Sequence, residues 1–232
     1  MAVEDLADSI GDFICAELDS SRVYLPTIEP SPMPTAEIVP FPEPTPSPTL
    51  ESYIFKQCSS ENELDIVFMV DSSGSVYDAE YNNWQAELDL VDDIVNSLPS
   101  ASSRASLINF SGCGASFSLT ECQEMGRMTT EFNLDTYGND LASVSSKIEA
   151  MDAADFNGGF TWTDEALGLA LNQFNTYSDS DKGKIIVLLT DGEPFPYDEG
   201  HEPCITSTNY ESATLAALNE LNVDIITIGI DI

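Results

Sequence analysis

Basic residues and long hydrophobic runs are the features that this sequence has least of. Its 232 residues include 41 acidic side chains but only 7 basic ones, which gives a formal net charge of −34. A surface of that sign repels phosphates, so nucleic-acid binding and charge-driven binding to anionic membranes are excluded. No stretch approaches the roughly 18 consecutive apolar residues of a transmembrane helix. The acidic excess would attract divalent cations or basic partners. An adaptation for solubility or for high salt explains it equally well.

Histidines and close cysteine pairs are also scarce. His201 is the only histidine, and no two cysteines are closely spaced, so we do not expect a zinc site. An odd number of cysteines leaves at least one unpaired within a monomer. Two of them, Cys113 and Cys122, flank a glycine-containing loop, and we predict a disulfide between them, with free thiols as the alternative. The full set is Cys15, Cys58, Cys113, Cys122 and Cys204.

Composition divides the chain into three parts. Residues 1–25 are acidic with a weak helical pattern, and we interpret them as the end of a preceding domain or as a marginal helix. Residues 26–57 are rich in proline spaced by Ser, Thr and Glu, which predicts an extended linker. Residues 58–232 have the pattern of one folded domain. The acidic start lacks the basic region of a signal peptide, so either the protein is intracellular or its true start lies upstream.

Short apolar runs alternate with amphipathic stretches along residues 58–232. Apolar, β-branched runs predict buried strands, and apolar residues recurring every three or four positions predict helices. Such alternation predicts an α/β fold with a doubly wound, mostly parallel sheet and helices on both faces. The expected strands are 66–70, 104–110, 128–132, 185–190 and 223–228, and the expected helices are 81–98, 139–151, 164–174 and 210–221.

Oxygen-bearing residues follow two of the predicted strands. Asp71, Ser73 and Ser75 alternate directly after the strand 66–70, and Asp191 follows the strand 185–190. The carboxyl ends of parallel strands share one edge of a sheet, where such folds bind ligands. Carboxylate and hydroxyl oxygens suit a hard divalent cation. Two carboxylates at that edge would repel one another without a cation. A metal site is therefore one interpretation of this edge, and an ordinary serine-rich turn after a strand is the other.

Three segments together resemble the von Willebrand factor A domain family and its metal-ion-dependent adhesion site. That site combines an Asp-x-Ser-x-Ser loop, a Thr after a Gly-Gly turn and an Asp-Gly after a later strand. The resemblance covers about residues 63–232, and the matching positions here are Asp71, Ser73, Ser75, Thr161 and Asp191.

The resemblance implies how the site would work. Ser73 and Ser75 would bind Mg²⁺ or Mn²⁺ directly, Thr161 directly or through water, and Asp71 and Asp191 mainly through water. An open coordination position would then accept an Asp or Glu carboxylate from a protein partner. The implied function is an extracellular or cell-surface adhesion and interaction module without enzymatic activity. The family fold continues with a sixth strand and a C-terminal helix, so we expect residues 58–232 to be C-terminally incomplete.

Two alternatives remain open at the level of sequence. One is a Mg²⁺-dependent hydrolase, although no basic residue flanks either acidic loop, and Lys182 and Lys184 lie at the opposite end of their strand. The other is a cytoplasmic scaffold module with the same fold. We expect Thr163 and Asp164 to cap the helix after Thr161 rather than to bind metal.

Overall fold

Five strands form a single mixed sheet in the computed structural model, which describes residues 63–76, 83–98, 103–113, 118–179, 181–191 and 208–229. The strand order is β3-β2-β1-β4-β5, with β1 at the centre. Neighbouring strands are parallel except β3, which runs antiparallel to β2. The predicted doubly wound, mostly parallel sheet is therefore confirmed. The strands are β1 (Leu64–Asp71), β2 (Ser103–Phe110), β3 (Met128–Phe132), β4 (Gly183–Thr190) and β5 (Val223–Gly229).

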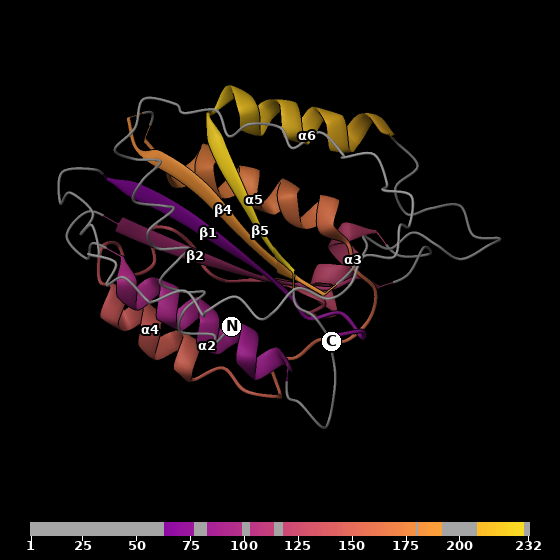
Figure 1. Ribbon diagram of the computed structural model, residues 1–232. Coiled ribbons are helices and arrows are strands. Elements are labelled where there is room, and N and C mark those ends of the chain that lie inside the picture. Colours follow the sequence, from indigo (N-terminus) through magenta and orange to yellow (C-terminus); the bar gives the residue numbers. More distant parts are fainter. Residues whose placement is uncertain are drawn as a thin grey trace, which may run out of the picture.

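Helices cover both faces of this sheet, as Figure 1 shows. One face carries α2 (Asn83–Ser97) and α4 (Leu141–Glu149), and the other carries α5 (Thr163–Tyr177) and α6 (Thr208–Glu220). Within the ranges that the structure describes, no helix is both long and apolar enough to cross a membrane. The segments predicted at 1–25 and 26–57 lie outside the described residues, as does His201.

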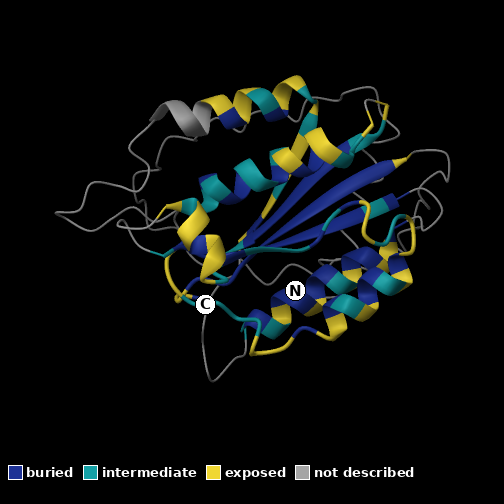
Figure 2. Cartoon of the chain, turned by 180° about the vertical axis from the view of Figure 1, so that it is seen from behind, coloured by how far each residue is buried: buried dark blue, intermediate teal, exposed yellow. Residues whose placement is uncertain are grey.

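The core is split in two by the central strand. Successive side chains of a strand point to opposite faces of a sheet, so β1 feeds both halves. Ile66, Phe68 and Val70 pack with the apolar faces of α2 and α4, whereas Val67 and Met69 pack with α5. All five side chains are fully buried, and Figure 2 shows the central strands dark blue between helices whose outer faces are exposed. This two-sided burial explains why β1 is a continuous apolar run.

A buried ion pair joins β1 to β2 near the amino-terminal ends of these strands. The Arg104 guanidinium donates two hydrogen bonds of 2.7 Å to the two carboxylate oxygens of Asp65, and it also donates to the Tyr177 carbonyl at 2.9 Å. The hydrogen bonds to Asp65 raise the pKa of Arg104. Asp71 lies at the other, carboxyl end of β1. The ion pair therefore stabilises the sheet without occupying the end where Asp71 lies.

Two local predictions need correction. The sequence analysis left out a short helix, α3 (Leu119–Glu124), whose first turn is closed by a capping box between Ser118 and Glu121. The prediction that Thr163 and Asp164 cap α5 was wrong: the N-cap residue is Trp162, and its side chain makes no capping hydrogen bond. A capping residue must precede the first turn in a non-helical conformation, whereas Thr163 and Asp164 already lie within that turn.

Candidate metal centre

Asp71 is the last residue of β1, and its carboxylate is held in a defined orientation. The Thr190 hydroxyl, at the end of the neighbouring strand β4, donates to Asp71 Oδ2 at 2.7 Å. The backbone N–H of Ser73 donates to Asp71 Oδ1 at 2.8 Å. Asp71 and Ser73 are both buried. The carboxyl ends of the two central strands thus meet at one point, as the sequence predicted.

A chain of hydrogen bonds links the remaining residues of this edge. Ser73 Oγ and Ser75 Oγ are 3.1 Å apart, and Ser75 Oγ donates to Asp191 Oδ1 at 3.1 Å. Ser75 is exposed, and Asp191 is partly exposed. Four of the five predicted site residues, from two loops 116 positions apart, therefore converge at one solvent-facing point.

The loop that carries Thr161 lies against the loop that carries the serines. The N–H of Gly74 donates to the carbonyl of Gly159 at 2.8 Å, and Thr161 follows two residues later and is buried. Gly159 has a φ of 114°, and a Cβ at this position would overlap the Gly112 carbonyl oxygen. Only glycine fits this conformation and this close approach. The Gly158-Gly159 pair is therefore a structural requirement for seating the Thr161 loop.

Ser72, which lies between the ligand candidates Asp71 and Ser73, faces inward. The Ser72 hydroxyl donates to Asn109 Oδ1 at 2.5 Å, and Asn157 Nδ2 donates to the same oxygen at 3.0 Å. Asn109 Nδ2 donates in turn to the Asp155 carbonyl at 2.8 Å. Because Ser72 is anchored below the loop, Ser73 is available to the site above it. Nothing in the local sequence pattern had pointed to Asn109 or Asn157 as supports for this edge.

Buried carboxyl groups dominate the electrostatics of this edge. Burial raises the pKa of Asp71, and the nearby Asp191 raises it further, whereas the hydrogen bonds from Thr190 and Ser73 lower it. Glu87 on α2 is also fully buried, and neither of its carboxylate oxygens has a hydrogen-bond partner among the described residues. Burial, with smaller contributions from the charges of Asp71 and Asp191, raises the pKa of Glu87 to about 10. A bound cation would relieve the repulsion between Asp71 and Asp191.

The donor set fits a hard divalent cation. No group of three or more His, Cys, Asp or Glu side chains in the described part of the chain could hold a metal ion. The edge instead offers two carboxylates, Asp71 and Asp191, together with hydroxyls. Ions such as Mg²⁺ and Mn²⁺ accept such oxygen ligands and keep several waters, so a few protein oxygens are sufficient.

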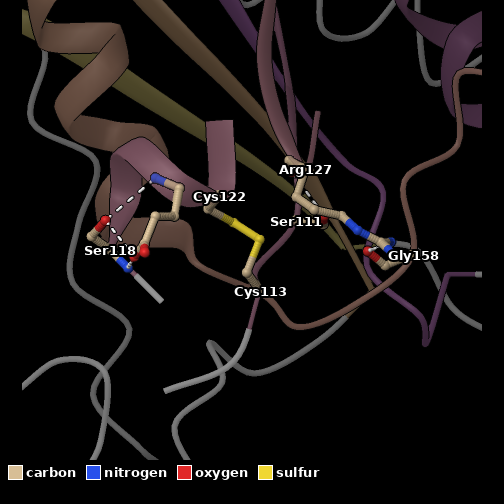
Figure 3. Close-up of a disulfide and its surroundings, with 7 residues drawn as sticks. Ser111, Cys113, Ser118, Cys122, Arg127 and Gly158 are labelled. Carbon is tan, nitrogen blue, oxygen red and sulfur yellow. Dashed lines mark hydrogen bonds between the residues drawn. A yellow bond between two sulfur atoms is a disulfide. The ribbon is translucent and has the colours of Figure 1, made fainter. Parts of the chain in front are cut away.

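The predicted disulfide is present and lies beside this edge. Cys113, just after β2, is bonded to Cys122 on α3 (Figure 3). Gly112, the preceding residue, pairs with Phe160 of the Thr161 loop through a 3.0 Å hydrogen bond from the Phe160 N–H. The disulfide therefore fixes a segment that contacts the loop carrying Thr161.

An arginine missed by the sequence analysis holds the same loop. Arg127 Nη1 donates to the Gly158 carbonyl at 2.6 Å, and Figure 3 shows the guanidinium reaching that residue. The sequence argument noted that no basic residue flanks the acidic loops. That is true along the chain, but Arg127 reaches Gly158, in the loop that carries Thr161, from 31 positions away, and no local pattern signals such a contact.

Residues 65–231 match the von Willebrand factor type A domain. This is well over half of the chain, and the chain belongs to the von Willebrand factor type A domain family. Over 182 residues, 76% of this chain, it is 28% identical to the collagen alpha-6(VI) chain of Homo sapiens. Over 145 residues, 62% of this chain, it is 30% identical to the collagen alpha-2(VI) chain of Gallus gallus. The matched stretches span only 7% and 13% of those two relatives.

Solved structures share the fold. Proximal thread matrix protein 1 from the mussel byssus has a TM-score of 0.53 and 22% identity, covering 72% of this chain and 38% of that one. A manganese-loaded TRAP protein of Plasmodium vivax has a TM-score of 0.50 and 19% identity, covering 74% of this chain and 59% of that one. Another structure of the byssus protein, with a zinc-occupied metal-ion-dependent adhesion site, has a TM-score of 0.50, 22% identity and the same coverage as the first. At these identities the likeness shows the fold alone.

Proposed function

We propose that this domain is a protein-binding module whose recognition depends on a divalent cation, Mg²⁺ or Mn²⁺. The cation would be held at the carboxyl edge of the sheet by Asp71, Ser73, Ser75, Thr161 and Asp191. The observation that carries the proposal is the hydrogen-bonded convergence of Asp71, Ser73, Ser75 and Asp191 at the ends of the two central strands. Manganese and zinc in structures of similar fold support a divalent cation at this edge.

The ion would supply Lewis acidity to an incoming ligand. The directly bound ligands would be neutral hydroxyls, whereas Asp71 and Asp191 would bind mainly through water, so the cation would keep affinity for a further anion. The natural ligand for that position is the carboxylate of an Asp or Glu on a partner protein. In this function the ion bridges two proteins and no bond is broken. We therefore infer that the domain acts in adhesion rather than in catalysis.

An extracellular or cell-surface location fits this function. The Cys113–Cys122 disulfide persists in oxidising compartments and is rare in the cytosol. The similar proteins include collagen VI chains and a byssus matrix protein, which supports the same location. A cytoplasmic scaffold would have to keep this cysteine pair reduced.

Calorimetric titration of the full chain with Mg²⁺ and with Mn²⁺ tests the metal site. We expect one specific site above a weak background from the acidic surface. Asp71→Asn should abolish the specific site, whereas Asp93→Asn, which removes an exposed carboxylate of α2, should leave it unchanged. Equal titration curves for the two variants would refute the assignment.

Dependence on EDTA and salt tests the adhesive function. With a net charge of −34, an acidic partner gains nothing from long-range attraction, whereas a directly coordinated ion is only weakly screened by salt. EDTA should therefore abolish partner binding, and moderate salt should leave it intact. Binding that survives EDTA but is lost in salt would indicate a charged scaffold surface, and cation-dependent hydrolysis of a phosphate ester that requires Asp191 would indicate an enzyme.

A further inference from the structure

Arg127 stands out among the cations of this chain. Among the other basic residues of the described ranges, Arg104, Lys147 and Lys182 form ion pairs with carboxylates, and Lys184 donates to two backbone carbonyls. The structure gives Arg127 no carboxylate partner in the described part of the chain, although the chain carries 41 acidic residues. Arg127 is partly exposed. Because no described carboxylate pairs with its guanidinium, the group can bind an anion from a partner.

Arg127 lies close to the candidate metal centre. Its Nη1 lies 2.6 Å from the Gly158 carbonyl oxygen, and the next carbonyl, that of Gly159, accepts from Gly74 of the serine loop at 2.8 Å. Consecutive Cα atoms are about 3.8 Å apart. The guanidinium therefore lies on the order of 10 Å from the metal centre, a span that one to three residues of an extended peptide can bridge.

Arg127 is also held rigidly. The Ser111 N–H and the Ser111 hydroxyl each donate to the Arg127 carbonyl at 2.8 Å, and the Arg127 N–H donates to the Cys122 carbonyl at 3.0 Å. Cys122 is itself tied to Cys113 by the disulfide (Figure 3). Within the described ranges, the guanidinium uses one of its five N–H donors, on Gly158. A preorganised cation loses little entropy when it binds an anion.

The loop between Arg127 and the metal centre adds an apolar contact. Phe160 follows Gly159 directly and is 39% exposed, one of the few large hydrophobic side chains of the described core that face solvent. Its backbone is fixed by pairing with Gly112. An exposed, anchored aromatic side chain is a typical contact of a protein-binding surface.

We propose that Arg127 is a second anchor for the partner, binding a second carboxylate that lies one to three residues from the one on the metal. This inference rests on the proposed cation-dependent function and specifies the partner: an extended segment that carries two acidic residues. The first carboxylate binds the ion, the chain passes over Phe160, and the second carboxylate binds the free N–H groups of Arg127. Recognition thereby requires a spacing as well as a charge.

Blocked peptides test this inference. One peptide carries a single Asp flanked by glycines, and three others add a Glu one, two or three residues after that Asp. Each is titrated into the ¹⁵N-labelled full chain saturated with Mg²⁺ at about 0.15 M ionic strength, with binding followed by amide chemical shifts. We expect the best-spaced two-acid peptide to bind about fivefold more tightly than the one-acid peptide, the size of a favourable partly exposed ion pair.

Variants separate anchoring from simple loop bracing. In Arg127→Gln the fivefold advantage of the two-acid peptide over the one-acid peptide should disappear. Both affinities are measured on the same variant, so any effect of losing the Gly158 contact cancels in their ratio. Lys147→Gln, which removes a cation already paired with Glu131, should keep the advantage. The inference is overturned if no two-acid peptide gains affinity, if the gain survives Arg127→Gln, or if Arg127→Gln weakens Mg²⁺ and every peptide in parallel. One-acid binding that is equal in Mg²⁺ and in EDTA would instead refute the proposed function itself.

Discussion

The replacement Glu87→Gln should stabilise this protein at neutral pH, although it changes a fully buried side chain. Glu87 lies on α2, and neither carboxylate oxygen has a hydrogen-bond partner among the described residues. Burial, reinforced by the charges of Asp71 and Asp191, raises its pKa from 4.5 to about 10. Glutamine has nearly the same shape as protonated glutamic acid and cannot ionise. The replacement therefore leaves the packing of α2 intact and removes only the ionisable carboxyl group.

The size of the effect follows from proton linkage. At pH 7 the folded chain holds Glu87 protonated, whereas the unfolded chain ionises it, so folding requires uptake of a proton. Stability is therefore fully present below pH 4.5 and falls as the pH rises from 4.5 toward 10. Each pH unit costs about 1.4 kcal/mol, so the penalty at pH 7 is about 3 kcal/mol. Glu87→Gln should raise the free energy of unfolding by about that amount at pH 7 and by almost nothing at pH 4.5.

Urea unfolding followed by circular dichroism measures this difference. Wild type and Glu87→Gln are compared at pH 4.5 and pH 7 in EDTA, so that cation binding does not contribute. Asp93→Asn, which changes an exposed carboxylate of the same helix, serves as the control and should show no such pH dependence. If Glu87→Gln has the same effect at both pH values, or destabilises at pH 7, Glu87 is not held in its neutral form and the reasoning fails.

Two further predictions concern the packing around the site and the ion pair at the opposite end of the sheet. Gly112→Ala should both destabilise the domain and weaken Mg²⁺ binding, because a Cβ at this position would overlap the Trp162 ring beside the Thr161 loop. Thermal unfolding measures the first effect and calorimetry the second. Wild-type metal affinity in this variant would show that the packing at Gly112 does not support the metal centre. Asp65→Asn should cost about 3 kcal/mol in urea unfolding, because it leaves the Arg104 guanidinium unpaired against the core. Metal affinity should not change in Asp65→Asn, and a loss there would show that the two ends of the sheet are coupled.

Several features of the fold follow from local sequence. The apolar run of β1 marks a strand buried on both faces, and the regular recurrence of apolar residues marks the long helices that pack on it. The helix α3 was missed because its six residues are too few to show a period. Its signal was present in another form, since Ser118 and Glu121 have the spacing of a capping box. Helix α5 shows the opposite error, because Thr163 and Asp164 look like caps but lie inside the first turn.

The candidate metal centre also combines features that the sequence predicts with features that it does not. Asp71, Ser73, Ser75 and Asp191 could be named in advance because parallel strands bring their carboxyl ends to one edge, so chain order and strand pattern determine proximity. The disulfide partners could be proposed because they lie only nine positions apart along the chain. Their pairing could not be decided from sequence, since it requires the positions of the loop after β2 and of α3.

The sequence by itself determined the alternation of strands and helices, the oxygen donors at the strand ends and the acidic character of the surface, because each depends on residues close along the chain. Tertiary structure alone decided that Glu87 is buried without a partner, that Asn109 anchors Ser72, and that Arg127 reaches Gly158. These features join segments 31 or more residues apart or depend on how a helix face is covered. Local propensity carries no information about such contacts, since they arise only when the whole core packs together.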